Sequence, residues 1–373
     1  MSSRICLLLV LAVSLIGCAA RPGMEVLRPA GAVSADGQVI TVQVVTTRAR
    51  ADAGSNSFTN TRSRTTNFAE YAVSVPPTHR AGQIEWPRVP ADPATSFTTL
   101  RSDVLTRDSF EAGLRGRRCE NGGKRVFIFV HGFNTNFPEA LFRVVQMTAD
   151  TNPDVIPILF AWPSDAEVLG YVADRDSAMY SRDALANLLA RVAELCRGEQ
   201  VTIIGHSMGA WLTVEALRQL RLAGRQEVLQ QLRVALASPD IDVDVFRTQV
   251  AVIGPLSPPM AVLVSRDDRA LSVSSRLSGD RRRLGRLDVD NPEVQEAARL
   301  AQIIVIDITE VAASDGFNHD RYVGFATAYA RMMAAGHAPP RSELRHAGAF
   351  VFNSVGTVLA SPFRLAGRML SPD

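Results

Sequence analysis

From Lys124 onward the chain alternates short, mostly apolar runs with amphipathic stretches, and this alternation restricts the fold more than any other feature. The runs have strand length and no polar face, so we expect parallel strands buried on both sides. The predicted strands are Val126–Val130, Val155–Ala161, Val201–Gly205, Arg233–Ala237, Met260–Ser265 and Ile303–Ile308. The predicted helices include Pro138–Thr148, Asp176–Cys196 and Ala210–Leu220. The pattern predicts an α/β fold with a mostly parallel central sheet covered by helices on both faces.

The region before Lys124 is less regular. Val39–Thr46 and Tyr71–Val75 are rich in alternating or β-branched residues and are predicted strands. The Ser, Thr, Asn and Arg residues of Asp52–Thr66 predict a polar loop, and three prolines predict irregular structure over His79–Thr99. Because no repeat and no second core is found, we expect one domain over residues 36–336.

The N-terminus carries a targeting signal. Ile5–Ile16 is apolar but too short to span a membrane, so residues 1–17 are predicted to be a secretion signal. Leu15-Ile16-Gly17-Cys18 resembles the bacterial lipobox, which implies cleavage before Cys18 and a lipid anchor on its thiol. Ala19 resembles the sorting pattern of outer-membrane lipoproteins, which implies a place in the bacterial cell envelope facing the periplasm. The alternative is an ordinary cleaved signal in which Cys18 is incidental.

Two flanking segments are predicted from composition. Residues 18–35 are rich in Ala, Pro and Gly, and we expect a tether that lifts the domain off the membrane. The tail, residues 337–373, is apolar with few acids and is predicted to be helical. Packing of this tail on the domain is preferred over an amphipathic segment lying on the membrane.

Cys119 and Cys196 are the other cysteines of the processed chain, and each precedes a predicted core strand by a similar distance. Since those strands should be parallel neighbours, the two thiols are expected at the same sheet edge. An oxidising compartment would then favour a disulfide, and the alternative is two isolated buried thiols.

Charge and composition exclude some partners. The chain has 40 basic and 38 acidic residues, a formal net charge of +2, and the charges are spread along the sequence. We therefore expect no nucleic-acid-binding face. No metal-ligand cluster and no phosphate-binding glycine loop is found, so neither a metal nor a cofactor is predicted.

Gly205-His206-Ser207-Met208-Gly209 matches the G-x-S-x-G motif and stands between a predicted strand and a predicted helix. This context is that of the nucleophile elbow of α/β hydrolases, where a sharp turn presents the serine above the sheet. Ser207 is therefore the candidate nucleophile. The alternative is a loop serine that only caps a helix.

A serine nucleophile needs a base and an acid, which follow it along the chain in this fold. His319 follows the last predicted strand and is the candidate base, whereas His337 and His346 lie in the tail. The acid is Asp267 or Asp268, after the strand Met260–Ser265. The other candidates, after the preceding strand, are Asp240 and Asp242.

Three further residues are predicted to surround the reaction. The loop His131-Gly132-Phe133-Asn134 ends a core strand, and in this fold such a loop donates a backbone N–H to the oxyanion hole. Phe133 and Met208 are the predicted donors. Trp162 is predicted to line the substrate pocket, or else to pack only against a helix. Arg281-Arg282-Arg283 could contact an anionic headgroup, although a solvated loop is the more common case.

Five motifs in order carry a resemblance. They are His131-Gly132-Phe133-Asn134-Thr135, Phe160-Ala161-Trp162-Pro163-Ser164, Gly205-His206-Ser207-Met208-Gly209, Ser238-Pro239-Asp240-Ile241-Asp242 and Ser265-Arg266-Asp267-Asp268-Arg269-Ala270-Leu271. Over about residues 40–330 the chain resembles a bacterial α/β-hydrolase family catalogued as a domain of unknown function. The resemblance implies that Asp268 is the triad acid and His319 the base, and it implies no particular substrate.

The expected activity is that of a serine hydrolase, most simply an esterase or lipase that cleaves an acyl ester through an acyl-enzyme. A thioesterase, an acyltransferase or a peptidase would use the same residues. The rival of another class is an envelope lipoprotein that keeps the fold without turnover. The acyl length and the oligomeric state have no sequence signal.

Overall fold

The structure is a computed structural model that describes residues 21–30, 37–117, 125–151, 154–334 and 350–352. In this part of the chain a ten-stranded sheet has the order β10-β9-β8-β7-β6-β4-β5-β1-β2-β3. The strands are β1 (Gln38–Arg50), β2 (Phe58–Val75), β3 (Thr98–Leu105), β4 (Val126–Val130), β5 (Ile156–Ala161), β6 (Val201–His206), β7 (Leu232–Ala237), β8 (Ala261–Val264), β9 (Ile304–Asp307) and β10 (Phe350–Phe352).

The centre of the sheet is parallel and its edges are antiparallel. Parallel pairing links β1 to β5 and continues through β4, β6, β7 and β8 to β9. The antiparallel pairs are β1 with β2, β2 with β3, and β9 with β10. Every residue of β4 is buried, as expected for a parallel strand with both faces covered.

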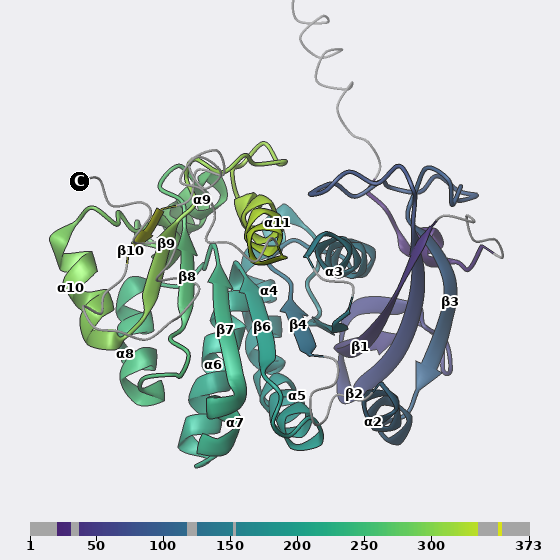
Figure 1. Ribbon diagram of the computed structural model, residues 1–373, viewed down its shortest axis with the longest axis horizontal. Helices are drawn as coiled ribbons and strands as arrows, with labels where there is room; N and C mark the ends of the chain where they lie inside the picture. Colours follow the sequence, from purple (N-terminus) through teal and green to yellow (C-terminus); the bar gives the residue numbers. More distant parts are fainter. Residues whose placement is uncertain (1–20, 31–36, 118–124, 152–153, 335–349, 353–373) are drawn as a thin grey trace, which may run out of the picture.

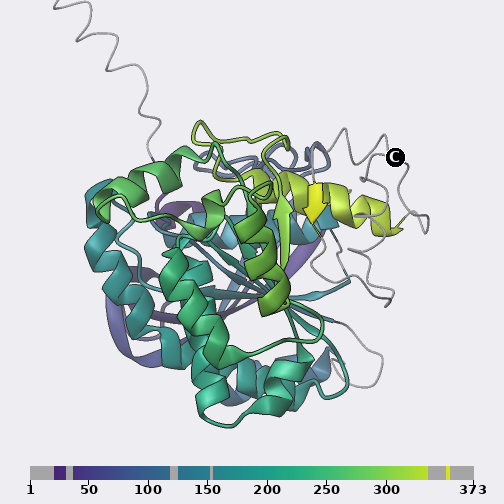
Figure 2. The ribbon, with the colours of Figure 1, turned by 90° about the vertical axis from the view of Figure 1, so that its left-hand side faces the viewer.

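Helices cover both faces of the sheet (Figures 1 and 2). The helical elements are η1 (Met24–Leu27), α2 (Arg107–Gly116), α3 (Phe137–Thr151), η2 (Val168–Gly170), α4 (Tyr171–Tyr180), α5 (Arg182–Leu195), α6 (Met208–Leu222), α7 (Gln226–Gln231), α8 (Val243–Ile253), α9 (Arg269–Leu277), η3 (Leu284–Arg286), α10 (Pro292–Ala301) and α11 (Arg321–Ala334). Within the described residues no helix is long and apolar enough to cross a bilayer.

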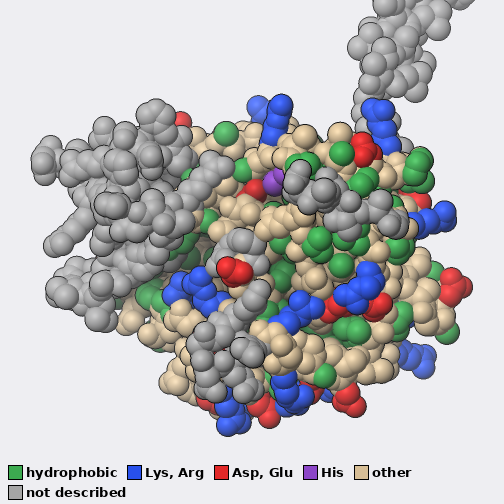
Figure 3. Space-filling model, turned by 45° about the vertical axis from the view of Figure 1, so that its right-hand side comes forward, with side chains coloured by type: hydrophobic (Ala, Val, Ile, Leu, Met, Phe, Trp, Pro, Cys, Tyr) green, Lys and Arg blue, Asp and Glu red, His purple; other side chains and the backbone are tan. Residues whose placement is uncertain are grey.

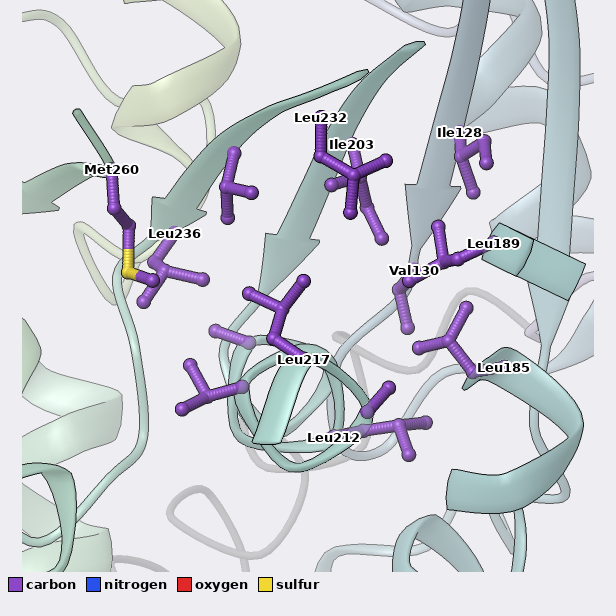
Figure 4. Packing of buried hydrophobic residues seen from close by; sticks show 14 of the residues in the cluster. Ile128, Val130, Leu185, Leu189, Ile203, Leu212, Leu217, Leu232, Leu236 and Met260 are labelled. Carbon is purple, nitrogen blue, oxygen red and sulfur yellow. The ribbon is translucent and has the colours of Figure 1, made fainter. Parts of the chain in front are cut away.

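The core consists of two apolar layers, one on each side of the sheet. In one layer α5, α6 and α8 pack against the sheet, and Figure 4 shows Leu217 of α6 directed toward the strands that carry Ile203 and Leu236. In the other layer α3, α11 and η1 pack against the opposite face. This arrangement confirms the predicted α/β fold with helices on both faces.

The six predicted core strands are all present, with ends within two residues of those expected. Outside them several predictions were wrong. The predicted polar loop Asp52–Thr66 is largely strand, because β2 begins at Phe58 and pairs with β1 through Arg62. The predicted helix Asp176–Cys196 is two helices that meet at Ser181.

The two terminal segments also differ from expectation. Residues 21–30 are not a free tether, because Val26 and Leu27 of η1 are buried in the core against α3 and β3. Hydrophobic burial therefore holds this part of the predicted tether on the domain. In the predicted helical tail, Phe350–Phe352 forms β10 instead. The rest of the tail, residues 1–20 with Cys18, and residue 119 lie outside the described residues.

Charged side chains are dispersed over the surface rather than gathered by sign. On the face shown in Figure 3, basic and acidic side chains stand beside one another with apolar groups between them. Several of these charges form ion pairs at the surface, such as Arg101 with Glu70 and Arg225 with Glu227.

Candidate active site

Ser207 lies in a sharp turn between β6 and α6, and its backbone has φ 54° and ψ −120°. A positive φ is unfavourable for a residue with a side chain, so the surrounding structure must hold it. Two backbone bonds to the neighbouring strand region do so: Ser207 N donates to Ala237 O at 2.9 Å, and Asp240 N donates to Ser207 O at 3.2 Å. The Ser207 residue is 4% exposed.

The glycines of the motif are required by close packing around this turn. A Cβ at Gly209 would lie 2.2 Å from His131 O, and a Cβ at Gly205 would lie 2.8 Å from Ala210 Cα. Gly132 is equally confined, because its Cβ would lie 2.9 Å from Ser207 Cβ. The loop after β4 and the turn after β6 therefore pack directly on each other.

The structure brings His319 and Asp268 together. His319 Nδ1 lies 2.7 Å from Asp268 Oδ2, and the Asp268 side chain is fully buried. Asp268 Oδ1 accepts from Leu271 N at 2.9 Å, so the carboxylate also caps the start of α9. Burial lowers the pKa of His319, but the charge and hydrogen bond of Asp268 raise it by a larger amount, so the net shift of the pKa is upward.

Asp267 and the rival acid Asp240 have other partners. Asp267 accepts from Asn318 Nδ2 at 2.8 Å and pairs with Arg321 at 2.7 Å, which ties the loop that carries His319 to α11. Asp240 accepts from Tyr171 Oη at 2.9 Å and Ser274 Oγ at 2.6 Å, and pairs with Arg283 at 3.2 Å. Arg283 is thus buried, and of the three consecutive arginines it does not face solvent.

His319 lies beside the turn that carries Ser207. Its ring centroid is 4.6 Å from that of His206, and its carbonyl oxygen accepts from His206 Nε2 and from Ser238 Oγ, both at 3.3 Å. Among the described residues no hydrogen bond joins Ser207 Oγ to the His319 ring. Burial lowers the pKa of His206 well below its ordinary value, so His206 is neutral. Its Nε2–H can then hold the backbone of His319.

Phe133 and Met208 supply two N–H groups that have no hydrogen-bond partner among the described residues. Met208 is the first residue of α6, a helix of 15 residues, where N–H groups and the helix dipole favour negative charge. Phe133 belongs to the loop whose Gly132 contacts the serine turn. The arrangement is suitable for holding an oxyanion.

The loop after β4 is held by a buried aspartate that the sequence analysis missed. Asp174 of α4 is 0% exposed and accepts from Asn134 N at 3.3 Å, Ser164 Oγ at 2.6 Å and Asp165 N at 2.7 Å. Burial raises the pKa of Asp174. No local motif marks this aspartate, which lies among ordinary helical residues.

A buried arginine of β1 completes the support. Arg48 donates to Ser164 O at 3.2 Å and to Thr135 O at 3.0 Å, and burial lowers its pKa to about 10. Arg48 was not predicted, because the expected strand ended two residues earlier, at Thr46. The only sequence signal that could have placed Arg48 in the site is a strand that extends beyond Thr46, as β1 does.

Trp162 is a support of the same loop. It is fully buried, stacks on His131 with ring centroids 4.8 Å apart, and donates from Nε1 to His131 O at 2.7 Å. Burial lowers the pKa of His131 to about 3, which keeps this ring neutral. A side chain with no exposed surface does not line an open pocket, so the predicted contact between Trp162 and substrate finds no support here.

The remaining predicted residues are described only in part. Cys196 is buried and disulfide-bonded, but Cys119 lies outside the described residues, so the pairing stays a prediction. Cys18 also lies outside them. No group of three or more metal-ligating side chains occurs among the described residues.

The sheet, the strained serine turn and the loops at its edge define the chain as an α/β hydrolase. More narrowly, it belongs to the family of alpha/beta hydrolases of unknown function (DUF900), whose model matches residues 106–335. The chain is also similar to the uncharacterized protein alr1448 of Nostoc sp. (strain PCC 7120), with 28% identity over 151 residues. That match covers 34% of this chain and 39% of the Nostoc protein.

Proposed function

We propose that the protein is a serine hydrolase that cleaves an acyl ester through Ser207, His319 and Asp268. The observation that carries the proposal is the 2.7 Å contact between His319 Nδ1 and Asp268 beside a serine held at φ 54°. A buried carboxylate on Nδ1 leaves Nε2 as the basic nitrogen and orients the ring.

In the proposed reaction His319 Nε2 takes the proton of Ser207 Oγ while the oxygen attacks the acyl carbonyl. The N–H groups of Phe133 and Met208 bind the oxyanion, and Asp268 stabilises the imidazolium. The tetrahedral intermediate collapses as Nε2 returns the proton to the leaving alkoxide, which departs as an alcohol. Water then attacks the acyl-enzyme with His319 again as base, which releases the acid and restores Ser207.

Thioesters, amides and transfer to another alcohol would need the same groups, so the ester is the simplest member of the class. The non-catalytic lipoprotein remains the rival. For location we propose a lipid on Cys18 and an outer-membrane position facing the periplasm, on the strength of the lipobox-like residues before Cys18. Loss of palmitate incorporation in Cys18→Ser tests this location separately.

The test of the activity is reaction of the purified protein with a fluorophosphonate, which modifies only an activated serine. We expect labelling of the wild type and none of Ser207→Ala. Ser102→Ala, on β3 at the far end of the sheet order, is the matched control and should react as the wild type does. Equal labelling of all three proteins, or none of the folded wild type, would contradict the proposal.

A further inference from the structure

Three large aliphatic side chains project into solvent from one turn of the chain. Val168 and Leu169 of η2 and Val172 of α4 are 70%, 97% and 73% exposed, and together we call them the η2–α4 surface. Single exposed apolar residues are normal, but three within five residues form a local apolar patch. Nothing in the fold requires them, since the inward side chain of this turn is Tyr171.

The η2–α4 surface lies at the edge of the sheet that carries the candidate active site. The Tyr171 ring contacts the Phe133 ring edge-on at 5.3 Å, and its hydroxyl lies 2.9 Å from Ser274 Oγ on α9. On α9 itself Val273 and Leu277 are also exposed, by 48% and 64%. Exposed apolar side chains thus lie on η2, α4 and α9, next to the predicted oxyanion loop and the predicted acid.

The first described residues are fixed beside this surface. Arg21 donates to Glu139 Oε1 at 2.6 Å and to Asn134 Oδ1 at 2.8 Å, and also bonds Ala166 O, two residues before Val168. Asn134 directly follows Phe133. The chain therefore enters the domain next to the active-site loops.

The predicted lipid attachment is close to this point. Cys18 precedes Arg21 by three residues, and an extended chain spans at most about 3.3–3.6 Å per residue. A lipid on Cys18 would therefore be attached within about 11 Å of Arg21. It would enter a bilayer on the side of the domain where Val168, Leu169 and Val172 are exposed.

We propose that the η2–α4 surface docks on the lipid bilayer and turns the active-site edge toward the membrane. The occupant of this surface is the boundary between headgroups and acyl chains, where apolar side chains are stabilised. A consequence is that the acyl ester reaches Ser207 from the membrane rather than from solution, and this part of the proposal rests on the proposed function.

The experiment uses the full, lipidated chain reconstituted in vesicles of phosphatidylethanolamine and phosphatidylglycerol. An environment-sensitive fluorophore is attached to Leu169→Cys or, as matched control, to Leu222→Cys. Leu222 is an exposed leucine at the opposite end of the helix that begins after Ser207. Lipids carrying nitroxides on the acyl chain should quench the fluorophore at position 169 and leave that at position 222 unquenched.

Equal quenching at both positions, stronger quenching at position 222, or a Cys18 that carries no lipid would overturn the proposal. Because this readout is independent of turnover, quenching at position 169 without fluorophosphonate labelling would reject the proposed function alone.

A second pair of variants tests whether the substrate comes from the membrane. Leu169→Glu should lower the ratio of vesicle-borne to soluble ester hydrolysis roughly tenfold, and Leu222→Glu should preserve that ratio. An unchanged ratio in Leu169→Glu would contradict entry of the substrate from the membrane.

Discussion

The parallel region of the sheet, β4 to β9, and the antiparallel wing, β1 to β3, differ in what their sequences reveal. The parallel strands are mostly apolar because helices cover both faces of the sheet, and each candidate catalytic residue follows one of these strands. The wing strands are long and partly polar, and their burial depends on pairing with neighbours. Yet Arg48 of the wing supports the loop that carries Phe133. The candidate catalytic residues thus follow the parallel strands, while one of the side chains that hold the oxyanion loop comes from the wing.

The largest effect should come from the two adjacent aspartates that end a parallel strand. We expect Asp268→Asn to lower kcat by about 10³–10⁴-fold, because the amide no longer holds the His319 tautomer or stabilises the imidazolium. Asp267→Asn is the matched control, since Asp267 bonds Asn318 and Arg321 and is 44% exposed in its side chain. It should change kcat only a few-fold, within about 1 kcal/mol. Steady-state kinetics compare the two, and equal losses would contradict the assignment of the acid.

The same strand ends show how far the sequence could predict the site. Ser207 was found from the G-x-S-x-G motif between a strand and a helix. His319 and the pair Asp267–Asp268 were found because each follows a predicted parallel strand, and the ends of parallel strands meet at one edge. The choice of Asp268 came from a family resemblance, because spacing alone cannot say which of two neighbours turns inward. Asp174 and Trp162 could not be placed, since their burial depends on contacts between distant loops.

The wing shows the matching limit for the fold. Thr59 to Thr66 is a run of polar residues that by composition predicts a loop, yet all of it lies in β2. Its backbone pairs with β1, and Arg62 reaches Ser177 Oγ of α4 at 3.1 Å. Backbone pairing needs no apolar side chains, so this part of β2 has no strand pattern in the sequence. Only its position beside β1 in the folded protein shows that it is a strand.

Removing the wing's contribution should give the next largest effect. Arg48→Met would remove the charge-assisted hydrogen bonds that Arg48 donates to Ser164 O and Thr135 O, and a hydrogen bond to a charged group typically contributes about 1.5–3 kcal/mol. We expect the free energy of unfolding in urea to fall by about 3 kcal/mol. Arg101→Met, an exposed arginine of β3, is the control and should cost less than about 1 kcal/mol. Similar losses in the two variants would show that the wing gives no specific support.

A smaller effect concerns the pH dependence of the parallel region. His319 must be neutral to act as base, and its pKa is raised above the ordinary value because Asp268 outweighs burial. The acid limb of kcat/KM should therefore lie above about pH 6.5, the ordinary histidine value. In Asp268→Asn burial remains without the opposing charge, so the limb of the residual activity should move to lower pH. A limb that stays in place would show that another group controls it.

The smallest effect should come from the contact that joins the two regions. His79, in the segment between β2 and β3, lies 2.7 Å from Glu85 and 3.0 Å from Asp150 at the end of α3. Burial lowers the pKa of His79, but the two carboxylates raise it by a larger amount, so the net shift of the pKa is upward. A histidine whose pKa is higher in the folded than in the unfolded protein stabilises the fold below the unfolded pKa. This stabilisation is lost as pH rises through the folded pKa.

The difference in unfolding free energy between wild type and His79→Gln, up to about 1 kcal/mol near pH 6, should shrink toward pH 8. Arg80→Gln, the neighbouring change, should show no such trend in urea unfolding. A difference for His79→Gln that grows with pH would mean that the contact between the wing and α3 does not depend on a charged histidine.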